Sequence, residues 1–516
     1  MAWSQDFIKS LDRPSKIVSY ILNFLPPAAD YTLSDGQYIS GGTQIALSDA
    51  DVTIDSVRVT PQRWSVNFGG FTIRIVGDIR PVANSSFRKG AVAELIMSRE
   101  GIRERVCIGQ LRSISGGRGV WTLEFVDFLT MMQSRLTAKA EESQFWFYAG
   151  ETAKVTNTFN FSSSANLYVD DITIFEKETG KNGMIKVQQS SSGNTDLFIW
   201  NSKTSTSGTA GYLTIVGRAM YPSTAAIGTL QVNDVVTSIA RLMGRPDLVF
   251  ARLVMSTGFG TNGTFDDYPA SWALGVPFNP SLFDYANLDT YYKEVWATPS
   301  GTHEIELQIE KAGNIQDFLT AVLNMGMWPV WDQNTLSWRV CQDPNSASWV
   351  TVRDHITDID IISIDSHHLY SPSQTSVFRK SVITGFDISS NSITQSTFFQ
   401  SSLRGGSLPV LPSSLEITRD NRLIYRSDTP NQPIKAVADL NRMARWDLDP
   451  YEELSITVTE KHCLLTAGDI VEISSMYIYG LTESAGDTYS NRRGMILGVR
   501  WNPAQSNVNL TIGVTR

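Results

Sequence analysis

The sequence has few cysteines and no long apolar run, and each shortage excludes a class of protein. The three cysteines, Cys107, Cys341 and Cys463, are too few and too widely separated for a disulfide framework or a paired-cysteine metal site. We interpret them as small buried residues of a protein made in a reducing cytosol. No apolar run approaches the roughly 20 residues of a membrane helix. The short apolar segment 17–25 has no cleavage site after it, and it is predicted to be a β-strand rather than a targeting signal.

Charge is also scarce. Charged residues make up 18% of the chain and hydrophobic residues 42%, a composition typical of globular proteins. The net charge of −9 argues against a protein that surrounds nucleic acid with lysine and arginine. The length of 516 residues predicts about three to four domains.

The main pattern that is present is a repeat. Four β-like segments follow one another near each end of the chain: 64–68, 90–95, 108–112 and 121–125, and then 454–458, 468–473, 495–500 and 508–512. In each set a glycine opens the second segment and a glutamate has the same place within it. The third segment of each set carries an apolar residue followed by arginine. A recurring unit of this kind predicts two similar β-domains at the two ends of the chain.

The middle of the chain has a different composition. Residues 151–225 are rich in Ser, Thr, Asn and Gly, but they contain apolar β-like runs at 167–174, 184–187, 196–200 and 212–216. These runs predict a small all-β insert rather than a linker. Helices are predicted at 233–243 with Asn233 as the N-cap, at 314–326, and from Pro433 to Trp446; a hairpin is predicted at 327–340.

The predicted fold is mainly β, with an α+β middle region. The predicted domains are an N-terminal β-domain at 1–140, a small all-β insert at 141–228, a helix and glycine-rich loop region at 229–300, a small α/β domain with a Trp-rich hairpin at 301–355, and a C-terminal β-domain at 356–516.

Residues 258–263, Gly-Phe-Gly-Thr-Asn-Gly, match the consensus of a dinucleotide-binding motif. That motif needs a helix directly after its glycines and a surrounding βαβ unit, and residues 264–269 cannot open such a helix. We interpret the segment as an exposed interaction loop that follows a partner's surface. Its predicted contact residues are Gly258, Gly260, Gly263, Asp266 and Asp267.

Other candidate chemistry is incomplete. Residues 86–89 spell Ser-x-x-Lys, but the partner motifs of serine acyl-enzymes are absent from the sequence. The adjacent pairs Glu141-Glu142 and Glu452-Glu453 do not have the arrangement of glycosidase acids, which flank a substrate across several ångströms. Three tryptophans are interpreted as core residues rather than sugar-stacking platforms: Trp331, Trp338 and Trp349.

A cluster of histidines and aspartates lies in the last third of the chain. Its members are His355, Asp358, Asp360, Asp365, His367 and His368. Because side chains alternate along a strand, some of these residues can share a face, and the sequence does not exclude a metal site. The favoured interpretation is a solvated strand edge with turn-forming aspartates. His462 and Cys463 are adjacent, which in a strand places them on opposite faces, and we interpret them as structural. The sequence therefore predicts no catalytic residues, no cofactor and no metal.

Several stretches together resemble one family, the tail-tip or baseplate hub proteins of tailed bacteriophages and of phage-like gene transfer agents. The matching stretches follow the family's order across nearly the whole chain: 59–64 leading to 68–73, then 256–275, 356–366, 468–472 and 494–499. The resemblance implies a structural virion protein with two tube-type β-barrel domains per chain. It implies no named site residue. The iron–sulfur cluster of some relatives looks absent, since Cys463 is the only cysteine after Cys341.

The resemblance also implies partners and a location. The protein would be a homotrimer at the tail tip of the virion, made in the host bacterial cytoplasm. Its partners would be the hexameric distal tail or tail tube protein, the tape-measure protein, and tail fibre or central tip proteins. Genomic DNA would pass through the lumen without specific binding, and the acidic charge would either repel its phosphates or serve ordinary solubility. The alternative is a receptor- or carbohydrate-binding tail fibre or depolymerase.

Overall fold

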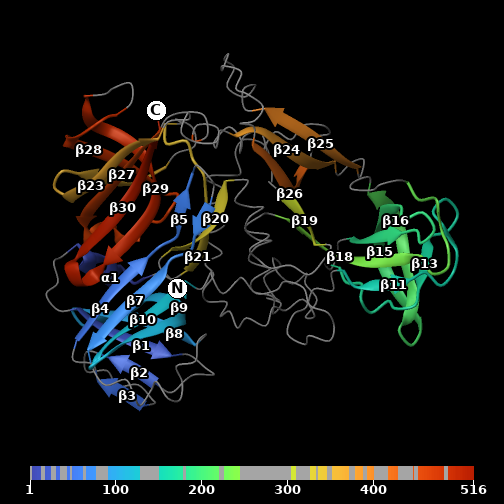
Figure 1. Cartoon of the computed structure of the whole chain (residues 1–516), viewed down its shortest axis with the longest axis horizontal. Helices are drawn as coiled ribbons and strands as arrows, with labels where there is room; N and C mark the ends of the chain where they lie inside the picture. Colours follow the sequence, from blue (N-terminus) through green and yellow to red (C-terminus); the bar gives the residue numbers. More distant parts are fainter. Residues whose placement is uncertain are drawn as a thin grey trace.

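The structure is a computed structural model (Figure 1). It describes residues 3–12, 18–24, 31–34, 43–46, 49–61, 65–76, 91–127, 150–177, 182–219, 226–244, 304–309, 326–332, 335–345, 351–370, 378–387, 392–399, 417–427, 446, 451–481 and 486–515. Strands dominate these residues, as the sequence predicts. None of the helices within these ranges is long and apolar enough to cross a membrane.

The described residues of the N-terminal β-domain form one short helix and ten strands. They are α1 (Gln5–Leu11), β1 (Val18–Phe24), β2 (Tyr31–Ser34), β3 (Thr43–Ala46), β4 (Asp49–Asp55), β5 (Arg58–Thr60), β6 (Ser65–Asn67), β7 (Gly70–Val76), β8 (Val92–Arg99), β9 (Ile102–Gly117) and β10 (Val120–Asp127). Strand β1 confirms the prediction for 17–25. Strand β8 alternates buried and half-buried residues along its length, because successive side chains of a strand point to opposite faces.

The insert folds around a core of its own and lies at the other end of the molecule from the N-terminal β-domain in Figure 1. Its strands are β11 (Thr152–Lys154), β12 (Phe159–Asn160), β13 (Asn166–Val169), β14 (Gly183–Gln188), β15 (Thr195–Ser207), β16 (Ala210–Ala219), β17 (Thr229–Leu230) and β18 (Val235–Gly244). Strands β14, β15 and β16 confirm three of the four predicted β-like runs, and β13 confirms the first of them only at 167–169.

The helix predicted at 233–243 is wrong, because this segment is strand β18. Val236 and Ser238 are buried while Val235 and Thr237 are half-buried, which is the period of a strand. Asn233 has φ 75° and belongs to a turn instead of capping a helix. The β-branched residues of this segment suit a strand, and its pairing with β11 and β14 outweighs the apolar spacing that suggested a helix.

The middle of the chain continues the sheet of the insert. Its strands are β19 (Glu304–Ile309), β24 (Phe378–Asp387), β25 (Ser392–Phe399) and β26 (Ile417–Ser427), which follow β18 in the order β18-β19-β26-β24-β25. The hairpin predicted at 327–340 is confirmed by β20 (Met327–Asp332) and β21 (Thr335–Val340). Of the predicted helix at 314–326, only Gly326 is described, so this helix stays a prediction. Of the third predicted helix, only Trp446 is described, and it is helical and buried.

The C-terminal β-domain consists of strands and two short 3₁₀ turns. They are β22 (Val352–Thr357), β23 (Ile361–Tyr370), β27 (Tyr451–Thr459), η4 (Glu460–Leu464), β28 (Ile470–Tyr479), β29 (Thr488–Asn502), η5 (Pro503–Gln505) and β30 (Asn507–Thr515). Five of the strands form an antiparallel sheet in the order β23-β27-β30-β29-β28.

The N-terminal β-domain has the same five-strand order, β4-β7-β10-β9-β8, with the same antiparallel sense throughout. The two sets also follow the same order along the chain. One of the predicted repeat segments is misplaced: 64–68 is not the first strand of the N-terminal set, because β6 pairs with β5 in a separate hairpin. The strand of the N-terminal domain that corresponds to β27, the first of the four predicted C-terminal segments, is β7.

The ladder registers relate the two sets residue by residue. If Glu94 is equated with Glu472, the ladders also equate Leu111 with Ile496. Both third strands then have a register shift immediately after this position, at Arg112 in β9 and at Leu497 in β29. The predicted match of the glutamates is therefore consistent with the ladders. The predicted match of the apolar-arginine pairs is wrong, since Arg112 is equivalent to Leu497 and not to Arg500.

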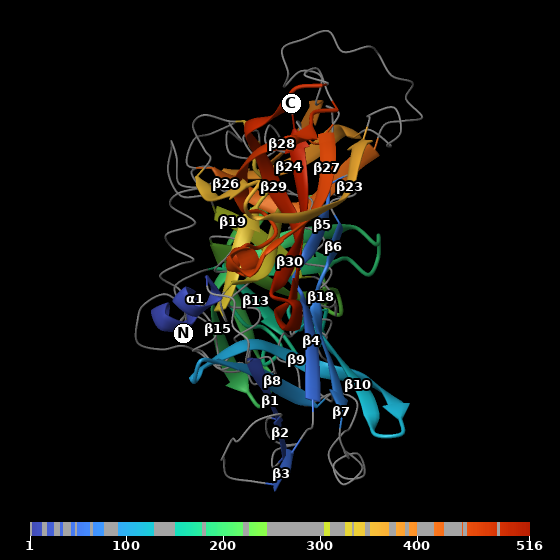
Figure 2. The same cartoon turned by 90° about the vertical axis from the view of Figure 1, so that its left-hand side faces the viewer.

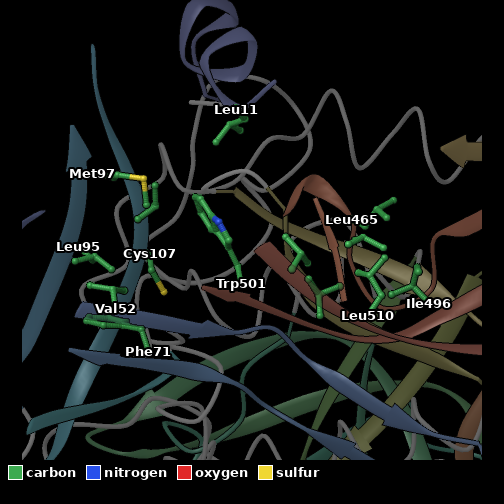
Figure 3. Packing of buried hydrophobic residues seen from close by; sticks show 14 of the residues in the cluster. Leu11, Val52, Phe71, Leu95, Met97, Cys107, Leu465, Ile496, Trp501 and Leu510 are labelled. Carbon is green, nitrogen blue, oxygen red and sulfur yellow. The ribbon is translucent and has the colours of Figure 1, made fainter. Parts of the chain in front are cut away.

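The two terminal β-domains share one hydrophobic core. The buried cluster includes Phe71, Leu95 and Met97 on one side and Ile496 and Leu510 on the other (Figure 3). Figure 2 shows the two domains stacked end to end, with β4 leading from one toward the other. Each fully buried side chain of this size contributes about 1.5–3 kcal/mol. The two domains are therefore parts of one folding unit, although their strands repeat.

Candidate functional site: the junction of the terminal domains

The terminal β-domains are joined edge to edge by strands β4 and β29. Arg500 lies opposite Asp55 in the antiparallel register, and its Nε donates to Asp55 Oδ1 at 2.6 Å. The Ser56 backbone N–H donates to the Val499 carbonyl at 2.8 Å, and the Val499 N–H donates to Ser56 Oγ at 3.1 Å. The hydrogen bond with Asp55 also raises the pKa of Arg500. The fourteen-stranded sheet is continuous across this contact.

Two glycines permit the close approach of chain segments at the end of β4. A Cβ atom on Gly69 would lie 1.8 Å from the carbonyl oxygen of Asp55. One on Gly70 would lie 2.1 Å from the carbonyl oxygen of Phe125. Gly69 lies between β6 and β7, and Gly70 opens β7. A side chain at Gly69 would displace the end of β4, and one at Gly70 would displace β10.

A buried ion pair crosses the same junction. Arg99 Nη1 lies 2.5 Å from Glu460 Oε2, and the two side chains are 0% and 3% exposed. Trp501 Nε1 donates to the other carboxylate oxygen of Glu460 at 2.9 Å. Arg99 ends strand β8 of one domain, while Glu460 and Trp501 belong to the other. A buried pair of this kind stabilises the junction only while both partners are present.

The first residues of the described chain cover this ion pair from one side. The Trp3 ring lies 5.8 Å from the Trp501 ring and 5.3 Å from the Phe7 ring, measured between centroids. Trp3 Nε1 donates to the Arg105 carbonyl at 2.9 Å. Helix α1 holds this arrangement, because the Ser4 hydroxyl caps it by accepting from the Phe7 N–H at 3.3 Å.

Two of the cysteines line a small cavity of about 70 Å³ at the junction, together with Trp3, Trp331 and Trp501. Burial raises the pKa of the Cys107 thiol, and Asp127 raises it further. Burial likewise raises the pKa of Cys463, with a smaller contribution from Glu460. Both thiols are therefore protonated at neutral pH, which suits packing rather than nucleophilic or metal chemistry.

An open groove of about 410 Å³ runs along the outside of the junction, between the two domains. Its lining includes Arg58, Arg112 and Arg500, all more than half exposed. Each of the three has an acidic partner: Glu453 at 3.6 Å, Glu124 at 3.7 Å and Asp55 at 2.6 Å respectively. The groove is thus balanced in charge and has the character of a solvated protein surface rather than of an anion site.

The histidine–aspartate cluster separates into pairs that stabilise the C-terminal β-domain. Buried His462 Nδ1 lies 2.6 Å from Asp354 Oδ2. Burial alone would raise the pKa of Asp354, but the hydrogen bond and the charge of His462 outweigh it, and the pKa is lowered. Asp360 accepts from the Thr357 N–H at 3.0 Å and pairs with Lys461 at 2.5 Å; these bonds lower its pKa against the opposing effect of burial. The structural interpretation of His462 therefore fits its contacts.

A second group of contacts in the cluster surrounds a fully buried carboxylate. Tyr489 Oη donates to Glu452 Oε2 at 2.6 Å, and His367 Nε2 lies 2.8 Å from the same oxygen. Burial, together with Glu452, raises the pKa of Tyr489 far above its usual value. Asp365 accepts from Thr457 and Asn509 on the neighbouring strands. Within the described residues, no three of the His, Cys, Asp and Glu side chains converge as metal ligands do.

The Trp-rich hairpin packs against the C-terminal β-domain. Trp338 is 5% exposed, in keeping with its predicted place in the core, and Trp331 is half-buried; Trp349 lies outside the described residues. Trp328 Nε1 donates to the Ala467 carbonyl at 3.0 Å, and Arg339 Nε donates to Asp469 at 2.8 Å. The hairpin therefore belongs to the same structural unit as the junction.

The predicted interaction loop lies outside the described residues, so the roles of Gly258, Gly260, Gly263, Asp266 and Asp267 stay predictions. The junction residues, in contrast, were not among the predicted site residues. A lone arginine at the end of an alternating strand is the only sign of Arg99 in the sequence, and nothing there pairs it with Glu460.

Comparison with known proteins gives structural neighbours only. No protein-family model matches the chain, and no curated protein matches it. A tail protein from Neisseria meningitidis MC58 is 9% identical, with 97% of this chain and 96% of that chain covered and a TM-score of 0.36. The 43 kDa tail protein of prophage MuSo2 from Shewanella oneidensis is 9% identical, with 96% of each chain covered and a TM-score of 0.35. A chain of the native gene transfer agent virion is 11% identical, with 46% and 84% covered and a TM-score of 0.20. With TM-scores this low, function has to be argued from the chain's own residues.

Proposed function

We propose that this chain is a structural protein of a tailed phage or gene transfer agent, a hub at the distal end of the tail. The hub closes the tail tube, connects the six-fold tube to a three-fold tip and forms part of the channel through which DNA leaves during host cell entry. One observation carries the proposal: a five-strand β-domain occurs twice in the chain, and the two copies join edge to edge.

This arrangement suits a ring. The contact between the domains is heterologous, since the edge β4 of the first copy meets the end of β29 in the second. Heterologous contacts that repeat with a suitable rotation close into rings. Three chains would supply six similar tube-type β-domains, alternating first and last around a central channel. Such a ring stacks on a hexameric tube protein, and the insert keeps the assembly three-fold.

The remaining partners follow from that position. The distal tail or tube protein meets one face of the ring, while the tape-measure protein and the fibre or central tip proteins meet the others. The loop with Gly258 and Asp266 is proposed as one such contact. DNA crosses the lumen without specific binding, and the net charge of −9 disfavours adhesion of its phosphates. We propose no catalytic activity, because the polar clusters described above have structural partners.

Electron microscopy of the particle tests the proposal. Virions carrying an epitope on this chain, decorated with a Fab, should show three Fabs at the distal end of the tail. An averaged map should show six similar β-domains around a channel. Label along the tail shaft, on fibres or on the capsid would overturn the hub position. A six-fold or monomeric density for this chain would overturn the ring.

A further inference from the structure

Exposed apolar residues are distributed unequally between the two terminal domains. Among the residues whose burial the structure describes, none in the N-terminal β-domain is an exposed large hydrophobic side chain. The C-terminal β-domain exposes eight: Ile359, Ile362, Ile364, Leu369, Met476, Tyr477, Tyr479 and Leu481. Single exposed apolar residues are ordinary, but a concentration on one domain marks a surface that another protein covers.

Four of the eight, Ile362 and Ile364 within β23, Leu369 near its end and Ile359 just before it, belong to an edge strand. Strand β23 pairs with β27 on one side, and among the described strands it has no partner on the other. An unpaired edge strand with apolar residues is a template for adding another strand, and proteins that leave it open blunt it with charges or proline. Between Ile361 and Tyr370 there is no lysine, arginine or proline, and the one carboxylate, Asp365, accepts hydrogen bonds from Thr457 and Asn509 of its own sheet. The apolar residues of this edge therefore leave it able to pair with another strand.

A second open edge lies on the N-terminal β-domain. The first part of β9 pairs with β8 up to Gln110, but among the described strands Ser113–Gly117 pair only with β10. These residues are exposed apart from half-buried Ile114. In both views, β23 lies in the upper part of the paired terminal β-domains and the β9–β10 hairpin in the lower part, so the two open edges do not meet within one chain (Figures 1 and 2).

The internal repeat relates these two open edges to the junction that is already closed. Continuing the ladder equivalences, Ile54 and Asp55 of β4 correspond to His367 and His368 of β23. Likewise Arg500 of β29 corresponds to Ser115 of β9. The open edge of β23 is therefore the repeat of the β4 edge. The open edge of β9 is the repeat of the β29 segment that pairs with it.

Burial at equivalent positions follows the same relation. Val52 is 1% exposed, while its equivalent Ile364 is 43% exposed. The same position is buried in the copy that has a neighbour and exposed in the copy that has none.

We infer that the edge of β23 pairs with the Ser113–Gly117 segment of β9 in a second copy of this chain. His368 then lies opposite the partner's Ser115, as Asp55 lies opposite Arg500. Leu369 meets the partner's Ile114, as Ser56 meets Val499. This pairing specifies the contact between neighbouring chains in the proposed ring. That three such contacts close the ring rests on the proposed function, whereas the paired residues and their register follow from the internal repeat.

Cysteine cross-linking of the full chain tests the register. The variant Ser115→Cys/His368→Cys should form disulfides between chains on mild oxidation, because directly opposed strand residues have Cβ atoms about 4.5–5.5 Å apart and small shifts reach disulfide geometry. The matched control is Asp55→Cys/Arg500→Cys, which places the same pair at the closed junction and should link within one chain. Each single variant, and a pair moved by one position with Ile114→Cys and His368→Cys, should link poorly.

The sizes of the cross-linked species test the β23–β9 pairing and the three-fold ring separately. Linked species that end at trimers on a non-reducing gel support both. Linked species that continue beyond trimers keep the β23–β9 pairing and overturn the three-fold ring. If the Asp55/Arg500 control links and the Ser115/His368 pair does not, in a protein whose mass is that of an oligomer, the pairing is wrong and the oligomer uses another surface. A monomeric protein that forms no linked species at high concentration overturns both.

A charge substitution provides an independent reading. Leu369→Lys changes a residue that is 41% exposed and lies opposite the partner's Ile114 in the inferred pairing. It should shift the protein toward monomer and weaken self-association at least tenfold in sedimentation experiments. Val216→Lys is the control, because Val216 is 48% exposed on the insert. Equal association of the two variants and the unmodified chain would overturn the inference.

Discussion

Removal of the buried cation at the junction gives the sharpest test of how the two domains are held together. Arg99→Met retains most of the apolar volume but leaves Glu460, 3% exposed, without its cation. Breaking a buried pair in this way costs about 3–5 kcal/mol, because an uncompensated charge stays in a medium of low dielectric constant. Since about 1.4 kcal/mol is a factor of ten, opening of the junction should become about two to three and a half orders of magnitude more frequent.

Hydrogen exchange measured by mass spectrometry reads this opening directly. Peptides covering β4 and the end of β29 should lose protection by that factor in Arg99→Met, while peptides from the insert should not change. The double variant Arg99→Met/Glu460→Gln should recover most of the loss. Its glutamine carries no charge, and its side-chain oxygen can still accept from Trp501 Nε1.

A second ion pair at the same junction serves as the control. Arg500 and Asp55 are 60% and 41% exposed, and an exposed pair contributes about 0.2–1 kcal/mol. Arg500→Met should therefore reduce protection by about fivefold or less. The reasoning fails if Arg99→Met and Arg500→Met have equal effects, or if the effects of Arg99→Met and Glu460→Gln simply add in the double variant.

Three further predictions concern the C-terminal β-domain and the Cys107 thiol. Tyr489→Phe removes a donor from the fully buried Glu452 and should lower the free energy of unfolding by about 1.5–3 kcal/mol in urea, whereas no change would mean that the Tyr489 hydrogen bond is not formed. The lowered pKa of Asp354 means that its carboxylate stabilises the fold at full strength above the ordinary value of 3.8, and that this stabilisation is lost as pH falls from there through the folded value. Asp354→Asn should therefore destabilise the protein at pH 7, and the difference from the unmodified chain should shrink only as pH falls below 3.8; a difference already absent at about pH 5 would contradict this. Cys107 is buried and its thiol is protonated at neutral pH, so it should not react with a maleimide at pH 8 until urea unfolds the chain; rapid labelling of Cys107 in the native protein would refute its burial.

The strand content was predictable because it depends on local patterns. Alternation of apolar and polar residues predicted β1, the strands of the insert and the β20–β21 hairpin, since burial on one face imposes a period of two. The same kind of argument was wrong for 233–243, where the apolar residues fit a helix face equally well. Pairing with β11 and β14 decided in favour of the strand, and a single segment carries no record of its partners.

The repeat was predictable in outline but not in register. The order of segments and the position of Glu94 and Glu472 were visible in the sequence. The matched arginines were misleading, because Arg500 lies three residues beyond Leu497, the true equivalent of Arg112, and only the ladders fix which residues correspond. The first strand was misplaced for a related reason: β5 and β6 form a hairpin of their own ahead of it.

The sequence by itself determined that this protein is a mainly β chain with a duplicated domain and a separate insert, since composition and periodicity are properties of the chain alone. Only the tertiary structure decided how the two copies meet. Arg99 and Glu460, or Asp55 and Arg500, come together because strands distant in the sequence lie side by side, and the energy of such a contact depends on burial that no local pattern encodes. The open edge of β23 is recognisable for the same reason, because an edge exists only once the sheet that ends there has been built.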